Sequence, residues 1–216
     1  MTDPVMTPSQ SSDHSSARDA RSGGFAWYVT LALGLALFIR FFVAAPYVVS
    51  GASMEPTFDN WDYLITDRLS YDFSAPERGD VIVFCLPNTG ECSLWKRIAQ
   101  QEWRGPRTLI KRVIGLPGET IAVEGGQIRI TNAENPNGFV LEEPYVADTN
   151  IGGPTGMEVT LGEGEYFVLG DNRKVSSDSR VWGALPKENI IGQVLVRLFP
   201  IDVIGLFPGD ATYVAE

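Results

Sequence analysis

The chain has 216 residues, enough for one medium-sized domain with a buried core and one further segment. Hydrophobic residues make up 44% of it and aromatic residues 11%, which excludes a chain that is disordered throughout. Acidic residues outnumber basic ones by 27 to 17, and the resulting net charge of −10 argues against a nucleic-acid partner.

Two segments precede the expected domain. Residues 1–24 are rich in Ser, Asp and Thr, which is typical of a disordered tail. Residues 25–45 are almost entirely apolar apart from Arg40, and as a helix they would span roughly 30 Å, the thickness of a bilayer core. Trp27 and Tyr28 suit the membrane interface at the start of this run, and Arg40 lies near enough to its end to reach the headgroups. We therefore predict a single transmembrane anchor at 25–45.

The arginines before the apolar run set its expected orientation. Arg18 and Arg21 precede the run, so the positive-inside rule places the tail in the cytoplasm and residues 46–216 on the extracytoplasmic face of the cell membrane. A cleaved signal peptide is the alternative, because Phe25–Ile39 is a 15-residue apolar stretch that small residues soon follow. Pro46 would come directly after the scissile bond, however, where its ring and missing N–H disfavour cleavage. We favour the uncleaved anchor.

Beyond the anchor, the sequence is typical of short β-strands separated by turns. Turn signals such as PERGD, LPGE, EGGQ, GEGE and FPGD punctuate it, and no segment shows a helical period over three turns. The predicted strands are Val81–Phe84, Thr108–Ile114, Thr120–Val123, Gln127–Ile130, Tyr166–Leu169 and Ile190–Phe199. We predict a mainly β fold with an antiparallel β-rich core.

The segment at 131–165 is looser than the rest and contains TNAENPNG and TNIGGPTG. One interpretation is an inserted cap, roughly residues 125–165, and the other is a set of ordinary long hairpin loops. We give the two interpretations equal weight.

The stretch SGASMEPTF, residues 50–58, presents Ser53 in a turn of small residues directly after the apolar run. Ser53 is either a simple turn residue or a nucleophile held beside a membrane. A Ser-His-Asp triad is not expected, because the single histidine, His14, lies in the polar tail. Only two cysteines are present, so a zinc site is not expected either. A nucleophilic Ser53 would therefore need Lys, Asp or Glu as its base, without a metal or a cofactor.

Lys111 is the best candidate for that base. A lysine accepts a proton only when it is neutral, and burial among apolar atoms lowers its pKa from about 10.4 toward the neutral range. Lys111 lies in the apolar segment TLIKRVIG, where strand alternation places Leu109 and Val113 on its own face. The other lysines considered lie in polar surroundings; they are Lys96, Lys174 and Lys187.

The stretch GDNRKVSSDSRVWG, residues 170–183, is dense in hydroxyls and charges directly after an apolar strand. A solvated surface loop is the ordinary outcome of such a composition. Alternatively, its hydroxyls orient a buried lysine amine, and its Asp and Arg side chains pin the loop in place.

Four stretches, in this order after an apolar N-terminal run, resemble the bacterial type I signal peptidases (leader peptidases), membrane-bound serine proteases with a Ser-Lys dyad. They are SGASMEPT at 50–57, RGDVIVF at 78–84, LIKRVIGLPGE at 109–119 and GDNRKVSSDSR at 170–180. The resemblance implies a β-rich catalytic core with a smaller inserted β subdomain. It also implies an endopeptidase that removes signal peptides from exported preproteins, cutting after Ala-X-Ala.

The resemblance assigns roles to individual residues. It makes Ser53 the nucleophile and Lys111 the general base, with the Ser176 hydroxyl orienting the lysine. It also implies two supporting ion pairs, Asp178 with Arg180 and Asp171 with Arg112.

The oxyanion hole and the specificity pocket follow from the same resemblance. Some family members carry a serine two positions before the nucleophile, but this chain has Gly51 there, as other members do. The Ser53 backbone N–H would be one oxyanion donor, and a second N–H or the Ser50 hydroxyl would be the other. Met54 would pack under the dyad. The pocket for small side chains would be lined by Val49, Met54 and Ile110.

A substrate would lie extended against strands near Tyr47–Ser50 and Thr108–Lys111. The resemblance further implies an apolar surface that rests on the outer leaflet of the membrane. The apolar residues near the C-terminus that fit such a surface are Leu198, Phe199, Ile204, Leu206 and Phe207. For Leu198 and Phe199, a final core strand is an alternative of at least equal weight.

Cys85 and Cys92 have six residues between them in FCLPNTGEC, and they would face an oxidising compartment in the predicted topology. We predict that they close a small disulfide loop, with two free thiols as the alternative.

Two other functions fit parts of the sequence. A self-cleaving repressor-type peptidase shares the Ser-Lys dyad, but the apolar run and the lack of a helix-turn-helix pattern before the dyad argue against it. A membrane-tethered β domain that only binds envelope partners would leave Ser53 as a turn residue, and it requires Lys111 to titrate normally.

Overall fold

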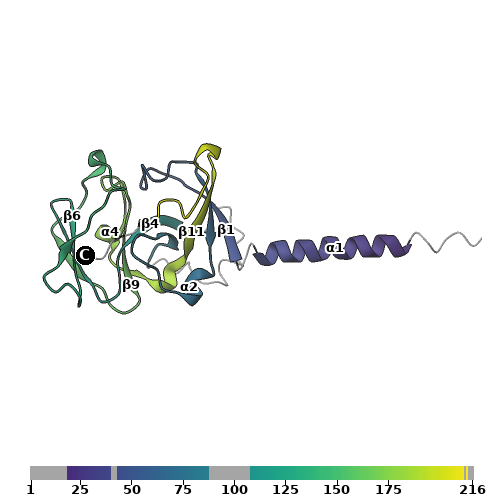
Figure 1. Cartoon of the computed structure of the whole chain (residues 1–216), viewed down its shortest axis with the longest axis horizontal. Coiled ribbons are helices and arrows are strands. Elements are labelled where there is room, and N and C mark those ends of the chain that lie inside the picture. Colours follow the sequence, from purple (N-terminus) through teal and green to yellow (C-terminus); the bar gives the residue numbers. More distant parts are fainter. Residues whose placement is uncertain (1–18, 40–42, 88–107, 212, 214–216) are drawn as a thin grey trace, which may run out of the picture. The chain divides into compact units, whose positions relative to one another are not determined.

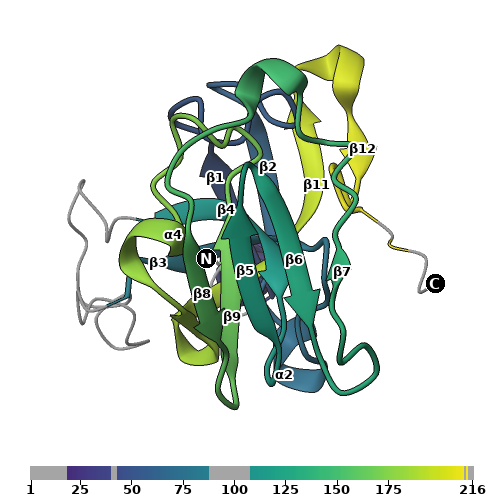
Figure 2. The same cartoon turned by 90° about the vertical axis from the view of Figure 1, so that its left-hand side faces the viewer.

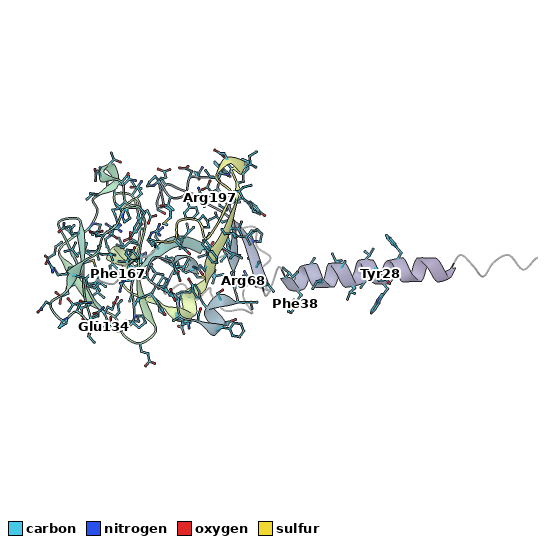
Figure 3. The ribbon with its side chains drawn as sticks, in the orientation of Figure 1. Tyr28, Phe38, Arg68, Glu134, Phe167 and Arg197 are labelled. Atoms are coloured by element: carbon cyan, nitrogen blue, oxygen red, sulfur yellow. The ribbon has the colours of Figure 1, made fainter. Side chains whose placement is uncertain are left out.

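The computed structural model describes residues 19–39, 43–87, 108–211 and 213, and the chain divides into two units, residues 1–41 and 42–216. The first unit contains the helix α1, Asp19–Phe38 (Figure 1). Its large apolar side chains from Phe25 onward are exposed, and Tyr28 projects away from the helix axis (Figure 3). Within the described ranges, we find no helix with the length and apolar character needed to cross a membrane.

The helix ends earlier than the predicted range 25–45. α1 stops at Phe38, whereas Ala44 and Ala45 already belong to the strand β1, Ala44–Val48. β1 contains Pro46, and among the described residues it pairs on one side only, with the strand β2, Tyr63–Asp67. An edge strand tolerates proline because one row of its backbone groups makes no ladder bonds. Because β1 begins with the apolar residues Ala44 and Ala45, the sequence does not distinguish its start from the apolar run that precedes it.

The second unit is built on a large antiparallel sheet. Its strands follow the order β1-β2-β11-β3-β4-β9-β10, and β12 is added to β11. The remaining strands of this sheet are β3 (Val81–Cys85), β4 (Thr108–Gly115), β9 (Glu165–Leu169), β10 (Leu185–Pro186), β11 (Ile190–Phe199) and β12 (Gly205–Leu206). Every pairing in the sheet is antiparallel, as the mainly β prediction requires.

A second antiparallel sheet is inserted in the chain between β4 and β9 (Figure 2). Its strands, in the order β7-β6-β5-β8, are β7 (Phe139–Val140), β6 (Gln127–Thr131), β5 (Thr120–Glu124) and β8 (Met157–Thr160). The insertion therefore begins at Thr120, ahead of residue 125. Ile121 and Ile130 of this sheet pack in one buried cluster with Phe167 and Leu169 of β9, so the two sheets share a core.

The helices of the second unit are all short. They are α2 (Ser70–Phe73), α4 (Ser179–Trp182) and the 3-10 turns η2 (Asp148–Asn150), η3 (Lys187–Asn189) and η4 (Ile201–Val203). In the part of the chain that the structure describes beyond α1, no helix reaches two turns. The expectation that no long helix follows the apolar run is confirmed for these residues.

The C-terminal end of β11 and the turn after it are exposed and apolar. Leu198 is 43% exposed and Phe199 54%, so the alternative that placed these two residues in the core is wrong. Both lie at the C-terminal end of β11, where Phe199 pairs with Tyr63 of β2. The other apolar residues of this end are also exposed: Ile201, Val203, Ile204, Leu206 and Phe207.

Candidate active site

The turn that carries Ser53 is fixed at both ends by backbone hydrogen bonds. The Val49 N–H donates to the Asp62 carbonyl over 2.9 Å, and the Trp61 N–H donates to the Val49 carbonyl over 3.0 Å. The side chains of Met54 and Phe58 are fully buried, whereas Ser53 is only half-buried. The turn therefore anchors its apolar residues in the core and keeps the serine hydroxyl accessible.

Gly51 explains the small residue two positions before the serine. Its φ of +103° lies in the region that L side chains rarely adopt, so glycine is favoured there. Its N–H donates to Asn60 Oδ1 over 3.0 Å. This N–H is thus already engaged, which leaves the hydroxyl of the exposed Ser50 as a candidate second oxyanion donor.

Ser53 and Lys111 are brought into direct contact, although 58 positions separate them in sequence. Lys111 Nζ donates to Ser53 Oγ over 2.7 Å and to the Ile110 carbonyl over 2.7 Å. Lys111 is only 2% exposed. A neutral amine at this distance is placed to accept the serine proton.

Burial lowers the pKa of Lys111 to about 8, although the negative charges of Asp178 and Asp171 oppose the shift. The strand supplies the apolar surroundings: Ile82 of β3 stands opposite Lys111, and Leu109 and Val113 pack in the same cluster as Ile82. The neighbouring acids raise the pKa less than the loss of water lowers it. A substantial fraction of the amine is therefore uncharged at mildly alkaline pH.

A buried ion pair joins the base strand to the loop after β9. Arg112 Nε donates to Asp171 Oδ1 over 2.9 Å, and Nη2 donates to Asp171 Oδ2 over 2.6 Å. Both side chains are 0% exposed, so the pair is stable only with such bidentate geometry. Thr57 Oγ1 also donates to Asp171 Oδ2, which ties the Ser53 turn to the same carboxylate. The predicted pair is present, and sequence reasoning missed Thr57.

A second buried pair shapes the loop at 170–183. Arg180 Nε and Nη2 donate to the two oxygens of Asp178, each over 2.8 Å. Asp178 Oδ2 also accepts from the Gly170 N–H over 3.2 Å. Arg180 donates further to the carbonyls of Gly152 and Arg173, each within 2.8 Å. The loop is therefore a buried, charge-paired structure, and the solvated-loop alternative is wrong.

Ser176 lies close to Ser53 but does not orient Lys111 as expected. A Cβ on Gly170 would lie 2.3 Å from Ser176 Oγ and 2.4 Å from the Ser53 carbonyl oxygen, so both atoms lie close to this glycine. Ser176 Oγ is buried, and within the described residues it has no hydrogen-bond partner. The amine of Lys111 is instead directed at Ser53 and Ile110.

The three residues expected to line a specificity pocket lie together. Val49 and Met54 are buried in one hydrophobic cluster, and Ile110 packs against it from β4. The cluster lies between the Ser53 turn and the base strand, because it draws residues from both. Its position fits contact with a side chain next to the scissile bond.

A further ion pair joins two of the four quoted stretches and was missed. Arg78 donates to both carboxylate oxygens of Glu119, over 2.6 Å and 3.0 Å. Burial alone would raise the pKa of Glu119, but hydrogen bonds from Arg78, Asn132 and the Leu116 N–H outweigh it and lower the pKa. Opposite charges in RGDVIVF and LPGE were the only sequence signal for this pair.

The remaining predictions about the site concern metals and cysteines. No group of His, Cys, Asp and Glu able to hold a metal ion occurs within the described ranges. Cys85 is disulfide-bonded in the structure. Cys92, the other cysteine of the chain, lies outside the described residues, so the pairing of these two stays a prediction.

Gly170→Ala tests whether the close approach of the two serines sets the dyad geometry. The added Cβ has to push apart the Ser53 carbonyl and Ser176, which displaces Ser53 from Lys111. We expect the rate of Ser53 acylation by a serine-directed reagent to fall by about tenfold or more. Gly205→Ala is the matched control, because its Cβ would meet only the Val203 carbonyl at 4.0 Å. An unchanged acylation rate in Gly170→Ala would contradict the role assigned to this contact.

Comparison with known proteins shows to which family this chain is related. A family model described as signal peptidase, peptidase S26, matches residues 23–199. A probable signal peptidase I-1 from Synechocystis sp. is 39% identical over 184 residues, which are 85% of this chain and 85% of that protein. A signal peptidase I from Leptolyngbya laminosa is 40% identical over 179 residues, 82% of this chain and 79% of that protein.

Among solved structures, a signal peptidase I from Enterococcus faecalis is similar to this chain with 29% identity and a TM-score of 0.39, covering 56% of this chain and 97% of that one. The family match includes both the turn of Ser53 and the strand of Lys111. The chain therefore belongs to the signal peptidase family, peptidase S26, and groups with the type I signal peptidases.

Proposed function

We propose that this protein is a membrane-anchored serine endopeptidase that removes signal peptides from exported preproteins through a dyad of Ser53 and Lys111. The observation that carries the proposal is the 2.7 Å contact between Lys111 Nζ and Ser53 Oγ, made by an amine whose pKa burial lowers to about 8. The signal peptidase relatives supply the substrate class. No metal or cofactor enters the proposed reaction.

The proposed reaction proceeds in two halves. Neutral Lys111 takes the proton of Ser53, and the serine oxygen attacks the carbonyl carbon at the end of the signal peptide. The ammonium then gives its proton to the leaving nitrogen, so the mature protein departs and the signal peptide stays as an ester on Ser53. Lys111 next takes a proton from water, whose oxygen attacks the ester, and the ammonium then returns that proton to Ser53 Oγ as the signal peptide leaves. The Ser53 N–H and the Ser50 hydroxyl would stabilise the oxyanion in both halves.

An extended substrate has an open strand edge beside the dyad. β4 pairs with β3 from Thr108 onward, but its pairing with β9 begins only at Arg112. Among the described residues, the other edge of positions 108–111 is thus available for an added strand. The cluster of Val49, Met54 and Ile110 would then restrict the residue before the cut to a small side chain.

We also propose that the apolar run between Phe25 and the start of β1 anchors the protein in the cell membrane, with the tail in the cytoplasm and the catalytic domain on the extracytoplasmic face. The proposal rests on the sequence of the apolar run and on the exposed apolar side chains of α1. The catalytic unit adds an exposed apolar row at one end of three neighbouring strands. Val48 and Phe199 both pair with Tyr63, and all three side chains are exposed. Lipid is the partner that such a surface fits.

Ser53→Ala and Lys111→Met should each abolish cleavage of an exported preprotein by the detergent-solubilised protein. The first removes the nucleophile and the second removes its proton acceptor, so we expect a loss of at least about 1,000-fold in kcat/KM. Lys187→Met is the matched control, since Lys187 is exposed on η3. Gel analysis of precursor and mature product measures the rates. Full activity in either variant would contradict the assignment of Ser53 and Lys111 as the catalytic dyad and would favour a domain that only binds its partners.

The pH dependence of cleavage should follow the titration of Lys111. The amine acts only when it is deprotonated, so kcat/KM should rise with pH and level off above the pKa of about 8. Between pH 6 and pH 7 the expected increase is about tenfold, because each pH unit below the pKa changes the neutral fraction about tenfold. Stopped assays of preprotein cleavage across pH 5.5–10 measure this rise in kcat/KM. A profile that is flat from pH 6 to pH 9 is incompatible with a lysine base.

Replacing Leu33 and Leu35 by arginine tests the anchor in the full-length chain. Two charges within the apolar run oppose membrane insertion by about 5 to 7 kcal/mol in total. We expect alkaline carbonate to release the variant from membrane pellets while the unaltered protein stays. The matched control replaces Glu158 and Glu163 of the second unit by arginine. Retention of the variant equal to that of the control would contradict membrane anchoring by this run.

A further inference from the structure

The last described residues of the chain pack against the guanidinium of Arg112. Arg112 Nη1 donates to the Gly209 carbonyl and, over 2.9 Å, to the Gly79 carbonyl. The approach is too close for side chains: a Cβ on Gly79 would lie 2.0 Å from the Ala211 carbonyl, and one on Gly209 would lie 2.4 Å from Thr57 Cγ2. We call Gly209, Ala211 and Tyr213 the C-terminal clasp.

Tyr213 connects the clasp to the aromatic face that supports Arg112. The hydroxyls of Tyr213 and Tyr145 lie 2.6 Å apart, and Arg112 Cζ lies 3.8 Å from the centre of the Tyr145 ring. Tyr145 donates its single proton to Glu143 Oε1 over 2.9 Å. A phenol has only one proton, so Tyr213 is the donor in the bond between the two tyrosines. Tyr213 thereby fixes the ring on which the guanidinium rests.

A second branch leads from the same tyrosine to the loop beside Ser53. Glu143 accepts hydrogen bonds from Nη1 and Nη2 of Arg173, and Arg173 Nε donates to the Gly170 carbonyl over 3.0 Å. Gly170 is the residue against which the Ser53 carbonyl and the Ser176 hydroxyl both pack. Tyr145 therefore contacts both the cation that holds Asp171 and the chain of bonds that holds Gly170.

We propose that the C-terminal clasp is a positioning element of the catalytic site, in which Tyr213 acts through Tyr145 to hold Arg112 against Asp171. Tyr213 and Tyr145 touch neither Ser53 nor Lys111, so they are positioning residues and not catalytic ones. The inference rests on the proposed function for its kinetic consequence, but its structural consequence, the charge balance around Lys111, exists whether or not a substrate is cleaved.

The charge balance gives the clasp a measurable effect. Two carboxylates, Asp178 and Asp171, act on the Lys111 amine and favour its charged form. Arg180 offsets the first and Arg112 the second, each through a bidentate pair. When Tyr145 loses its bond from Tyr213, Arg112 is held less firmly, and the charge of Asp171 is compensated less. The amine is then protonated to a higher pH, and less of the base is active at neutral pH.

The test compares the full-length protein with Tyr213→Phe, Tyr145→Phe and the double variant. NMR of dimethylated lysines, with Lys111 assigned from Lys111→Met, follows the titration of the amine directly. Preprotein cleavage between pH 6.5 and pH 9.5 gives kcat and KM for the same variants. Tyr63→Phe is the matched control, because Tyr63 of β2 lies outside both the cluster that contains Tyr145 and the cluster that contains the neighbours of Lys111.

We expect Tyr213→Phe to raise the titration midpoint of Lys111 by about half a unit and to lower kcat/KM at pH 7 about threefold, with KM unchanged. The loss should disappear at pH 9.5, and the double variant should match Tyr145→Phe. A midpoint equal to that of Tyr63→Phe, or a loss of activity that is the same at every pH, overturns the proposal. If the unaltered protein cleaves no preprotein, the proposed function fails, and the Lys111 titration still decides the role of the clasp.

Discussion

The site depends on one physical constraint: an amine must lose its water without gaining a salt bridge. Lys111 satisfies this constraint because β4 buries its side chain opposite Ile82 and beside Leu109 and Val113. Its amine donates hydrogen bonds to the Ser53 hydroxyl and to a backbone carbonyl, and neither acceptor is charged. The nearest acids, Asp171 and Asp178, are each paired with an arginine of their own. Burial thus lowers the pKa of Lys111, and the pairing of both acids with arginines limits how strongly they oppose that shift.

The same arrangement explains why buried ion pairs surround the dyad. Burying a charge pair contributes little net stability, because desolvation offsets the attraction, but it fixes geometry through several directed hydrogen bonds. Arg112 and Asp171 join β4, the Ser53 turn and the loop after β9, while Arg180 and Asp178 close that loop on itself. The pairs therefore define distances between segments that are far apart in sequence.

Local patterns predicted the parts of the fold that local patterns control. All six predicted strands are present, because alternation and flanking turn residues mark each of them. β2 and β8 were not predicted, and β1 was expected only as a strand near Tyr47–Ser50, because its first residues share their apolar character with the preceding run. β7, β10 and β12 have two residues each, too few for any period to show.

The site shows the same division. Ser53 and Lys111 stood out in their own stretches of sequence, whereas the pairs Asp178–Arg180 and Asp171–Arg112 were expected from the family resemblance. The expected bond from Ser176 to Lys111 is absent, since the amine points to other oxygens, and no sequence pattern encodes that direction. Tyr145, Glu143 and Tyr213 were missed because single aromatic and acidic residues in loose segments carry no periodic signal.

The register of β3 and β4 has an evolutionary consequence. The chain leaves β3 at Cys85 and returns at Thr108, and these two residues are direct partners in the ladder. The strand pairing ends at these two residues whatever the number of residues that joins them. The position of Lys111 in β4 therefore does not depend on that connection. Insertions or deletions in the sequence between these two residues are therefore compatible with an unchanged position of Lys111 in the sheet.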